Sequence, residues 1–440
     1  MKPEWAARYT VSDTDYGLRT TDYGAERPDD GPRSTDYRAK RPDNGLRTTE
    51  YEAQPPDSTV LADRAAGWRS AYVHIPFCAR RCPYCDFAVV AADEPGGAEF
   101  ERYVDALVAE VGMEPGPFPV DAVNLGGGTP TRIPPSHLSR ILDEIGARLG
   151  IARDAEISIE ANPEDWTDDR ARELRSSGFN RVSFGVQSLD PVVLLALGRA
   201  HSPDEATRAI IGAKSAGFEA ISVDLIYGTP EESDASWRRS VDGVLAIEPS
   251  HLSAYALTVE GGTALSRSII AGAPAPDPDQ QADRFEYVNA AAGDAGLIRY
   301  EVSNWARAGH ACRYNLSTWM MGEYAAFGTG AHDHRFGVRS RNIRRLGAYL
   351  ARIEKGERAR LGREQLDNFE SERERFMVGL RLAAGVEPGS IGGPFLASEG
   401  GRRLTDAEVV GLRDGRVVVL RPLLTDLVAR AVLSVSPDDC

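Results

Sequence analysis

From residue 70 onward, short apolar runs alternate with longer stretches in which apolar residues recur at helical spacing. The runs predict buried strands, and the longer stretches predict amphipathic helices. The predicted strands cover residues 71–75, 122–125, 156–160, 181–186, 220–226 and 251–257. The helices predicted between them cover residues 99–111, 136–149, 168–176, 203–216 and 235–247. Alternation of this kind indicates an α/β fold with a parallel sheet and helices outside it.

The two ends of the chain follow other patterns. Residues 1–65 repeat a Thr-Asp/Glu-Tyr theme with very few Leu, Ile or Val, so we predict a disordered polar tail that has nothing to bury. We assign residues 66–345 to the barrel domain and residues 346–440 to a small C-terminal, mainly helical domain, whose helical pattern starts at about Asp367. In that domain we expect a helix from a capping box at residues 405–408, a strand at 417–420 and a last helix at 423–433, together resembling a winged helix.

Composition narrows the possible classes of protein. A chain of 440 residues is too long for a single core, which stops growing near about 250–300 residues. The net charge of −15 argues against a nucleic-acid partner, which would require a basic surface. No apolar run approaches the length of a membrane span, and the N-terminus lacks the apolar core of a secretory signal. With its clustered thiols, the chain is expected in a reducing cytoplasm.

Three of the five cysteines lie in one short loop after the first predicted strand, as Cys78-x3-Cys82-x2-Cys85. Three thiolates on one loop can hold three irons of a [4Fe-4S] cluster. The fourth iron would then take a chelating small molecule, and S-adenosylmethionine (SAM) offers an amino and a carboxylate group for this purpose. The alternative is a structural zinc ion, which requires a fourth protein ligand, and the remaining cysteines, Cys312 and Cys440, are isolated.

The cysteine spacing, with Tyr84 before the last cysteine, resembles the radical-SAM superfamily. The wider string YVHIPFC at residues 72–78 resembles the oxygen-independent coproporphyrinogen III dehydrogenases and their relatives, the HemW heme chaperones. The resemblance extends from Ser70 to the C-terminus. It implies a partial (β/α)6 barrel, with a [4Fe-4S] cluster on Cys78, Cys82 and Cys85 and SAM beside it.

Further motifs follow the predicted strands at the ends where barrels of this type gather their chemistry. Gly126-Gly127-Gly128 lets a ligand approach the backbone, and Asp224 is an acid in an apolar run that needs a partner or a ligand. Glu160 alone would more often be a capping or solvent-facing acid. The resemblance implies that the SAM contacts are Tyr72, Tyr84, Gly127, Gly128, Thr129, Glu160, Gln187, Arg199 and Asp224.

One position separates the two kinds of relative. The dehydrogenases carry another cysteine two residues after the third cluster ligand, where this chain, like the chaperones, has Phe87. We therefore expect a heme chaperone that binds the cluster, SAM and heme, receives electrons from a donor and transfers heme to an unidentified acceptor protein. The alternative is a coproporphyrinogen III dehydrogenase, which would use the same cofactors for oxidative decarboxylation.

The chaperone pattern His-Asn-x-x-Tyr-Trp reads Tyr314-Asn-Leu-Ser-Thr318-Trp here, so the imidazole is replaced by a phenol. A tyrosine can ligate ferric heme. Four other potential ligands are close in sequence: His310, Cys312, His332 and His334. A histidine taken singly is more often a hydrogen-bonded structural residue than a metal ligand, so the heme ligand stays open at this point.

Overall fold

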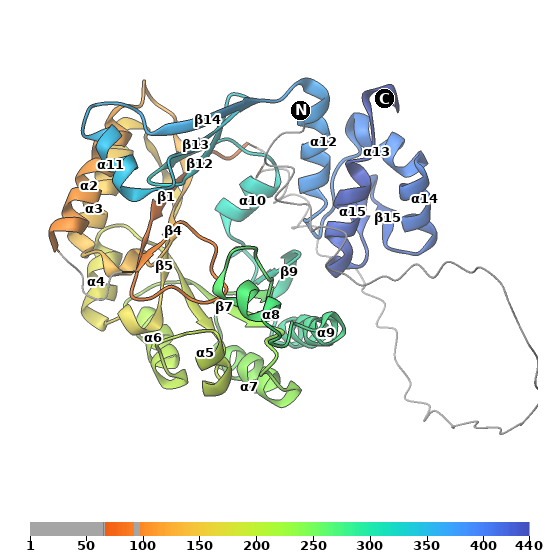
Figure 1. The fold of residues 1–440 in the computed structure, drawn as a ribbon, viewed down its shortest axis with the longest axis horizontal. Helices are drawn as coiled ribbons and strands as arrows, with labels where there is room; N and C mark the ends of the chain where they lie inside the picture. Colours follow the sequence, from red (N-terminus) through yellow and green to blue (C-terminus); the bar gives the residue numbers. More distant parts are fainter. Residues whose placement is uncertain (1–64, 66, 92–96, 440) are drawn as a thin grey trace, which may run out of the picture. The chain divides into compact units, whose positions relative to one another are not determined.

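The computed structural model describes residue 65 and residues 67–91 and 97–439 (Figure 1). Most of the repeat tail that we predict to be disordered, residues 1–64, lies outside the described residues. The description below therefore starts at the first strand of the barrel domain.

Six neighbouring parallel strands form the centre of a twelve-stranded sheet and confirm the six predicted strands. They are β1 (Ser70–Ile75), β4 (Val120–Gly127), β5 (Ile151–Ala161), β6 (Arg181–Gln187), β7 (Ala220–Tyr227) and β8 (His251–Ala256). Most of their β-branched and apolar residues are buried, as expected for strands covered on both faces. All six carboxyl ends therefore open at one edge of the sheet.

The predicted helices lie between these strands, on the outer side of the sheet (Figure 1). They are α2 (Gly97–Gly112), α3 (Pro135–Arg148), α4 (Asp168–Ser176), α6 (Pro203–Ser215) and α7 (Asp234–Leu245), with α5 (Pro191–Ala196), α8 (Ala264–Ile270) and α9 (Pro278–Asp294) in addition. Helix α3 buries Leu138, Ile141 and Ile145, which share one face at helical spacing. Ser202 and Ser233 begin α6 and α7 with capping boxes. The alternation of strand and helix forms the partial (β/α)6 barrel.

Both edges of the sheet are extended. On one side β11 (Tyr324–Phe327) is parallel to β1, and β12 (His332–Arg335), β13 (Val338–Asn342) and β14 (Arg360–Gln365) continue it in antiparallel fashion. On the other side β10 (Asn304–Ala306) and β9 (Ile298–Glu301) follow β8. Helix α10 (Arg313–Trp319) lies between these extensions in the chain.

The C-terminal helices pack around a second core that contains Phe376, Phe395, Val417 and Val428. Its elements are α12 (Asn368–Gly379), α13 (Gly389–Ala397), α14 (Glu399–Asp406), β15 (Val410–Arg413), β16 (Arg416–Val419) and α15 (Thr425–Val432). Strand β14 joins the main sheet, and α11 (Leu346–Ile353) packs into the main core. The second core thus begins near Asp367, where the predicted helical pattern starts.

One predicted element of this domain is wrong. Residues 405–408 end a helix instead of starting one, since α14 stops at Asp406 and β15 follows from Val410. The Thr405 hydroxyl donates back to the Gly401 carbonyl, one turn earlier, and Glu408 has a left-handed φ of 54°. The capping-box sequence is present, but the preceding residues already form a helix. The predicted strand and last helix are confirmed as β16 and α15.

None of the helices within the described ranges combines the length and the apolar character that crossing a bilayer requires.

Candidate functional site

Cys78 ends the very short strand β2 (Phe77–Cys78), and Cys82 and Cys85 lie in the loop between it and its parallel partner β3 (Val90–Ala91). Pro76 ends β1, and its carbonyl accepts from the Val90 backbone N–H at 2.7 Å, which closes the cysteine loop at its base. All three thiols are unpaired and partly exposed. The sequence of β1 thus leads directly into a closed loop that presents three sulfurs.

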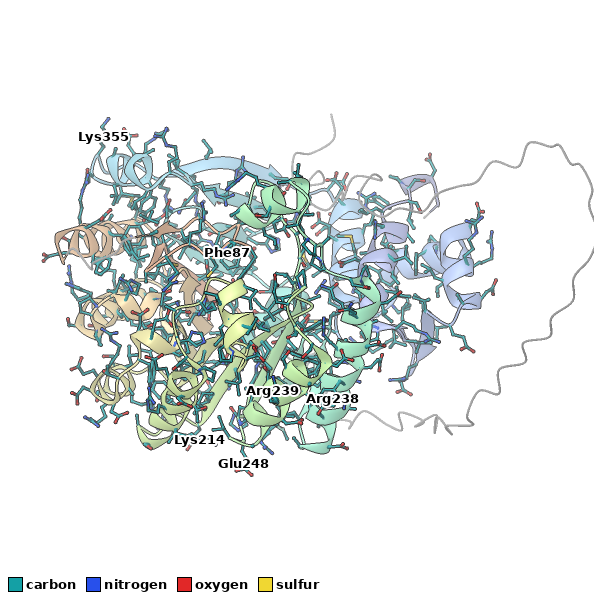
Figure 2. The ribbon with its side chains drawn as sticks, turned by 60° about the horizontal axis from the view of Figure 1, so that its bottom comes forward. Phe87, Lys214, Arg238, Arg239, Glu248 and Lys355 are labelled. Atoms are coloured by element: carbon teal, nitrogen blue, oxygen red, sulfur yellow. The ribbon has the colours of Figure 1, made fainter. Side chains whose placement is uncertain are left out.

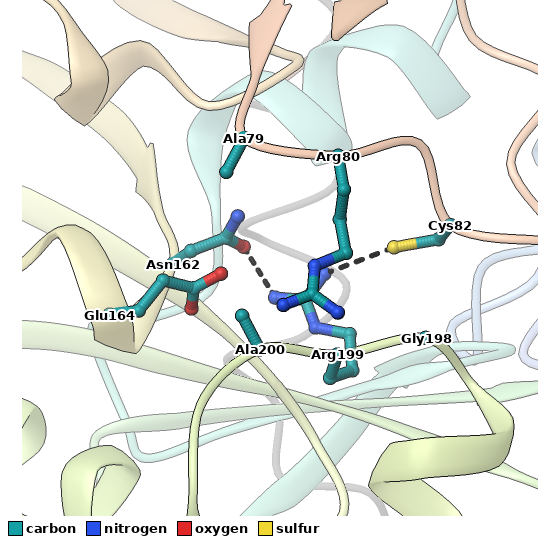
Figure 3. Close-up of a pocket in the computed structure, with 8 residues that line it drawn as sticks. All are labelled: Ala79, Arg80, Cys82, Asn162, Glu164, Gly198, Arg199 and Ala200. Carbon is teal, nitrogen blue, oxygen red and sulfur yellow. Dashed lines mark hydrogen bonds between the residues drawn. The ribbon is translucent and has the colours of Figure 1, made fainter. Parts of the chain in front are cut away.

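A hydrogen-bonded chain of side chains bridges Cys78 and Cys82. The Thr129 hydroxyl contacts the Cys78 Sγ at 3.7 Å and accepts from the Asn162 Nδ2 at 2.9 Å. The Arg199 guanidinium donates to the Asn162 Oδ1 and, through Nη1, contacts the Cys82 Sγ at 3.6 Å (Figure 3). We call Thr129, Asn162 and Arg199 the sulfur bridge. It anchors the cysteine loop to residues that follow β4, β5 and α5.

The thiols differ from ordinary cysteines in their acidity. Burial raises the pKa of Cys78 to about 11, although the Thr129 hydrogen bond lowers it and the neighbouring cysteines add to the rise. Burial also raises the pKa of Cys85, against a hydrogen bond from the Phe87 backbone. Iron binding by these sulfurs would therefore displace protons. The Arg199 guanidinium, whose Nη1 lies 3.6 Å from the Cys82 sulfur, also acts to lower the pKa of Cys78.

The glycine run is locked against the strand that enters the cysteine loop. The backbone N–H groups of Gly128 and Thr129 donate to the carbonyls of Ile75 at 2.8 Å and Phe77 at 2.7 Å. A Cβ on Gly128 would lie 2.7 Å from the Ile75 oxygen, and Gly127 has a φ of +104°. Glycine is required at both positions, by close backbone approach in one case and by a left-handed φ in the other.

Glu160 ends β5 and turns its carboxylate toward this run. Its Oε2 accepts from the Gly127 backbone N–H at 3.0 Å. Burial raises the pKa of Glu160 to about 7; the Gly127 and Asn124 hydrogen bonds oppose the rise, and the Asp224 carboxylate adds to it. The group can therefore be neutral or charged near neutral pH, and a cationic ligand would favour the charged form.

Asp224 lies on β7 and has the partners that a buried acid needs. The Ser183 hydroxyl lies 2.9 Å from Oδ2, and the Ser222 hydroxyl contacts Oδ1 at 3.5 Å. Burial raises the pKa of Asp224 despite these hydroxyl groups. Asp224 therefore has partners within the protein, which was one of the two alternatives for this acid. Its role in ligand binding stays a prediction.

The remaining predicted SAM positions lie around the same strand ends. Gln187 closes β6 with a left-handed φ of 65°, where the register with β7 shifts. Tyr84 packs beside Val193 and Leu197 and lies close to Cys82, and burial raises its pKa. Tyr72 on β1 is within the electrostatic range of Glu160. The predicted cysteine and SAM positions thus gather at one edge of the barrel.

Two residues of the site were missed from the sequence. Asn162 comes two residues after Glu160 and is the middle member of the sulfur bridge. His74 joins the Tyr72 hydroxyl at 3.1 Å to the Ala88 carbonyl at 2.9 Å, and so ties β1 to the returning end of the cysteine loop. The sequence signal that could have identified them is position, because each lies two residues after a predicted site residue, Tyr72 or Glu160.

A small pocket lies beside Arg199. Ala79, Cys82, Asn162 and Arg199 line it, together with Arg80, Glu164, Gly198 and Ala200 (Figure 3). The Arg199 Nε is buried there and has no hydrogen-bond partner. Across the described part of the chain no three His, Cys, Asp or Glu side chains converge on a point where a single ion would bind. A [4Fe-4S] cluster does not require its ligands to converge on one point, because each cysteine binds a different iron.

The sequence candidates for a heme ligand lie at or near α10 and on β12. Cys312 is buried, with its Sγ 3.5 Å from a Glu156 carboxylate oxygen. The carbonyl of His310 accepts from the buried Arg181, which starts β6 at the opposite end from the cysteine loop. The Tyr314 ring stacks on Tyr72 with centroids 5.9 Å apart. His332 and His334 lie on β12.

Comparison with known proteins identifies relatives across most of the chain. The family model of the radical SAM superfamily matches residues 72–243. "Heme chaperone HemW" of Mycobacterium tuberculosis (strain CDC 1551 / Oshkosh) is 39% identical over 325 residues, which cover 73% of this chain and 83% of that protein. The Bacillus subtilis (strain 168) protein of the same name is 33% identical, covering 72% of this chain and 84% of its own.

Among solved structures, the coproporphyrinogen III oxidase HemN of Escherichia coli, a radical SAM enzyme, superposes with a TM-score of 0.73 at 20% identity. The match covers 87% of this chain and 94% of that chain, and it confirms the fold. Together with the cysteine loop, the strand order and the extent of the sequence identity, these relatives show that the chain belongs to the HemW family of radical-SAM proteins.

Proposed function

We propose that the protein is a heme chaperone that carries a [4Fe-4S] cluster on Cys78, Cys82 and Cys85, binds SAM beside it and transfers heme to an acceptor protein. The observation that carries this proposal is the sulfur bridge, which links two cysteines to the loops after β4, β5 and α5. A zinc ion bound by three thiols would have no need of a guanidinium against one of them. A cluster with bound SAM, by contrast, brings together negatively charged thiolates and the carboxylate of SAM. A guanidinium beside them offsets this charge.

The residues present fit these cofactors. Three partly exposed thiols on one closed loop match a cluster with one iron left open. Gly127 and Gly128 expose backbone to a ligand, and Glu160 can accept hydrogen bonds from an ammonium or hydroxyl group. Arg199 offsets the negative charge of the thiolates. When bound, a cluster of this kind supplies single electrons, and its electron donor is part of the proposal.

Phe87 favours the chaperone over the dehydrogenase. It stands where the dehydrogenases carry a further cysteine, and its side chain is 61% exposed at the end of the cysteine loop (Figure 2). The relatives that are 39% and 33% identical carry the name of heme chaperones. The proposal includes a cytoplasmic location, because an open thiol-bound cluster needs a reducing surrounding.

The proposed function is tested on anaerobically reconstituted full-length protein. We expect heme to bind at about one per chain, because a chaperone must hold its cargo. With reductant, SAM and coproporphyrinogen III, we expect no protoporphyrinogen. Formation of that product would show that the protein is a dehydrogenase. Zinc without iron in elemental analysis would contradict the proposed cluster.

We expect Glu160→Gln to weaken SAM binding by on the order of 10- to 100-fold, because a hydrogen bond to a charged group contributes about 1.5–3 kcal/mol. For the unchanged protein, SAM affinity should fall as pH drops through about 7, where Glu160 becomes protonated. Equilibrium dialysis with labelled SAM across this range measures both effects. Affinity that is independent of pH, or unchanged in the variant, would contradict a role for this carboxylate.

The same substitution should have the opposite effect on stability. The pKa of Glu160 rises from 4.5 to about 7 in the folded protein, so its contribution to stability is present below 4.5 and is lost as pH rises through 7. Glu160→Gln should therefore raise the melting temperature of the SAM-free protein above neutral pH and leave it nearly unchanged in acid. Glu99→Gln, at an exposed position in the first turn of α2, is the matched control.

A further inference from the structure

Hydrogen bonding narrows the choice among the seven histidines of the chain. Three of them use both ring nitrogens in contacts with the protein and are not available as iron ligands: His74, His201 and His251. His137 lies on α3, on the outer side of the sheet, and His310 lies beside Arg181. The two histidines of β12 are the remaining candidates.

These two histidines share a face with two arginines. His332 and His334 are two residues apart on β12, so their side chains point to the same side of the sheet. Their antiparallel partners on β13 are Arg341 and Arg339, respectively. We call these four residues the His-Arg face. The alternate residue Arg335 lies on the other side, where it pairs with buried Glu114.

A backbone contact fixes the tautomer of His334. Its Nδ1 lies 3.4 Å from the Gly322 carbonyl oxygen, which can only accept, so the proton is assigned to Nδ1. This leaves the Nε2 lone pair as the donor to a metal, in the arrangement that ligating histidines commonly adopt. Burial, with the neighbouring Arg339, lowers the pKa of His334 and keeps the imidazole neutral.

A row of aromatic rings connects His334 with the position of the missing family histidine. The His334 ring lies 6.1 Å from the ring of Tyr324, which lies 6.5 Å from that of Tyr314. Tyr314 in turn stacks on Tyr72 of the proposed SAM site at 5.9 Å. The His334 imidazole thus belongs to the same contiguous group of side chains as Tyr314.

The arginines of the face differ in their surroundings. Arg339 pairs with Glu374 of α12 and with Glu364 of β14. Arg341 lies opposite Gly362, where a Cβ would come within 3.6 Å of the Arg341 Nε, so the guanidinium stem extends over a position without a side chain. A guanidinium in this position suits a carboxylate group, which it can bind through paired hydrogen bonds.

We propose that the His-Arg face binds heme, with the His334 Nε2 as an axial ligand to the iron and Arg341 paired with a propionate. The inference rests on the proposed heme-chaperone function and assigns its binding site. Ligation requires no electron transfer, since the imidazole donates its lone pair and the iron keeps its oxidation state.

The test is a titration of the anaerobically reconstituted full chain with ferric heme, followed by absorbance and electron paramagnetic resonance. We expect His334→Ala to weaken binding by on the order of 10-fold or more and to change the spin state, with added imidazole restoring the original spectrum. His137→Ala and His332→Ala are the controls and should keep the spectrum. Cluster absorbance in each variant verifies that the chain is folded, and His334→Gln provides a second, less disruptive variant.

Arg341 is tested separately with heme and with its dimethyl ester, which lacks the propionate charges. Arg341→Gln should weaken the binding of heme on the order of 10-fold without changing its spectrum, and it should leave the binding of the ester unchanged. Arg363→Gln, on the other face of the same strands, is the matched control and should have no effect.

The outcomes separate the site from the function. If the unchanged protein binds heme and both His334 variants retain its affinity and spectrum, the site is wrong while the function stands. The same conclusion follows if His332→Ala alone alters the spectrum. If the unchanged protein carries its cluster but binds no heme, the proposed function fails and the site with it.

Discussion

Cys82→Ser is expected to remove nearly all of the iron and the broad visible absorbance from the reconstituted protein. A serine hydroxyl is a poor ligand for iron beside thiolates, and a loop with only two sulfurs has no replacement within reach. The substitution also removes the sulfur that the Arg199 Nη1 contacts at 3.6 Å, so one end of the sulfur bridge loses its partner. Iron analysis and absorbance, measured after anaerobic reconstitution, quantify the loss.

Cys312→Ser is the matched control for this prediction. Cys312 is buried next to Glu156 and is not part of the cysteine loop, so its replacement should leave the iron content unchanged. A cluster that survives in the Cys82 variant would require a ligand from outside the loop. The double variant with Cys312 would then show whether that ligand is this cysteine or an external molecule.

Gly128→Ala is expected to have the second largest effect, which is a loss of stability and of cluster lifetime. The added Cβ would lie 2.7 Å from the Ile75 oxygen and 2.8 Å from the Phe77 oxygen, and neither backbone atom can move without shifting the strand that leads to Cys78. Crowding of this kind costs about 1–3 kcal/mol in stability. We therefore expect a lower melting temperature and a cluster that is lost more rapidly in air.

Gly293→Ala is the comparison for this variant. Gly293 lies in α9, and a Cβ there would meet no atom within 4 Å. It should stabilise the protein slightly, since alanine favours a helix by about 1 kcal/mol over glycine. Equal stability and equal cluster lifetime in the two variants would show that the approach of Gly128 to β1 is not required.

The sulfur bridge connects the cysteine loop to the loops that follow β4, β5 and α5. Because Arg199 reaches both the Asn162 amide and the Gly185 carbonyl, a displacement of the loop after α5 would be transmitted to the Cys82 sulfur. Thr129 connects the glycine run to Cys78 in the same way. The glycine run and the cysteine loop are therefore linked through hydrogen-bonded side chains.

The sequence by itself determined the six parallel strands, their outer helices and the loop with three cysteines. Each is encoded locally, by apolar periodicity or by the spacing of sulfurs within eight residues. It also located Glu160 and Gly128 at strand ends. It did not indicate that residues 405–408 would end a helix, because a capping sequence does not specify whether the preceding residues are already helical.

Only the tertiary structure decided which side chains meet. Asn162 and Arg199 are 37 residues apart, and their hydrogen bond exists because β5 and β6 are adjacent in the sheet. The His-Arg face likewise depends on the antiparallel register of β12 and β13, in which a shift of one residue would turn His334 to the opposite side. Contacts between distant segments are set by strand order and register, and neither is contained in the local pattern of a single segment.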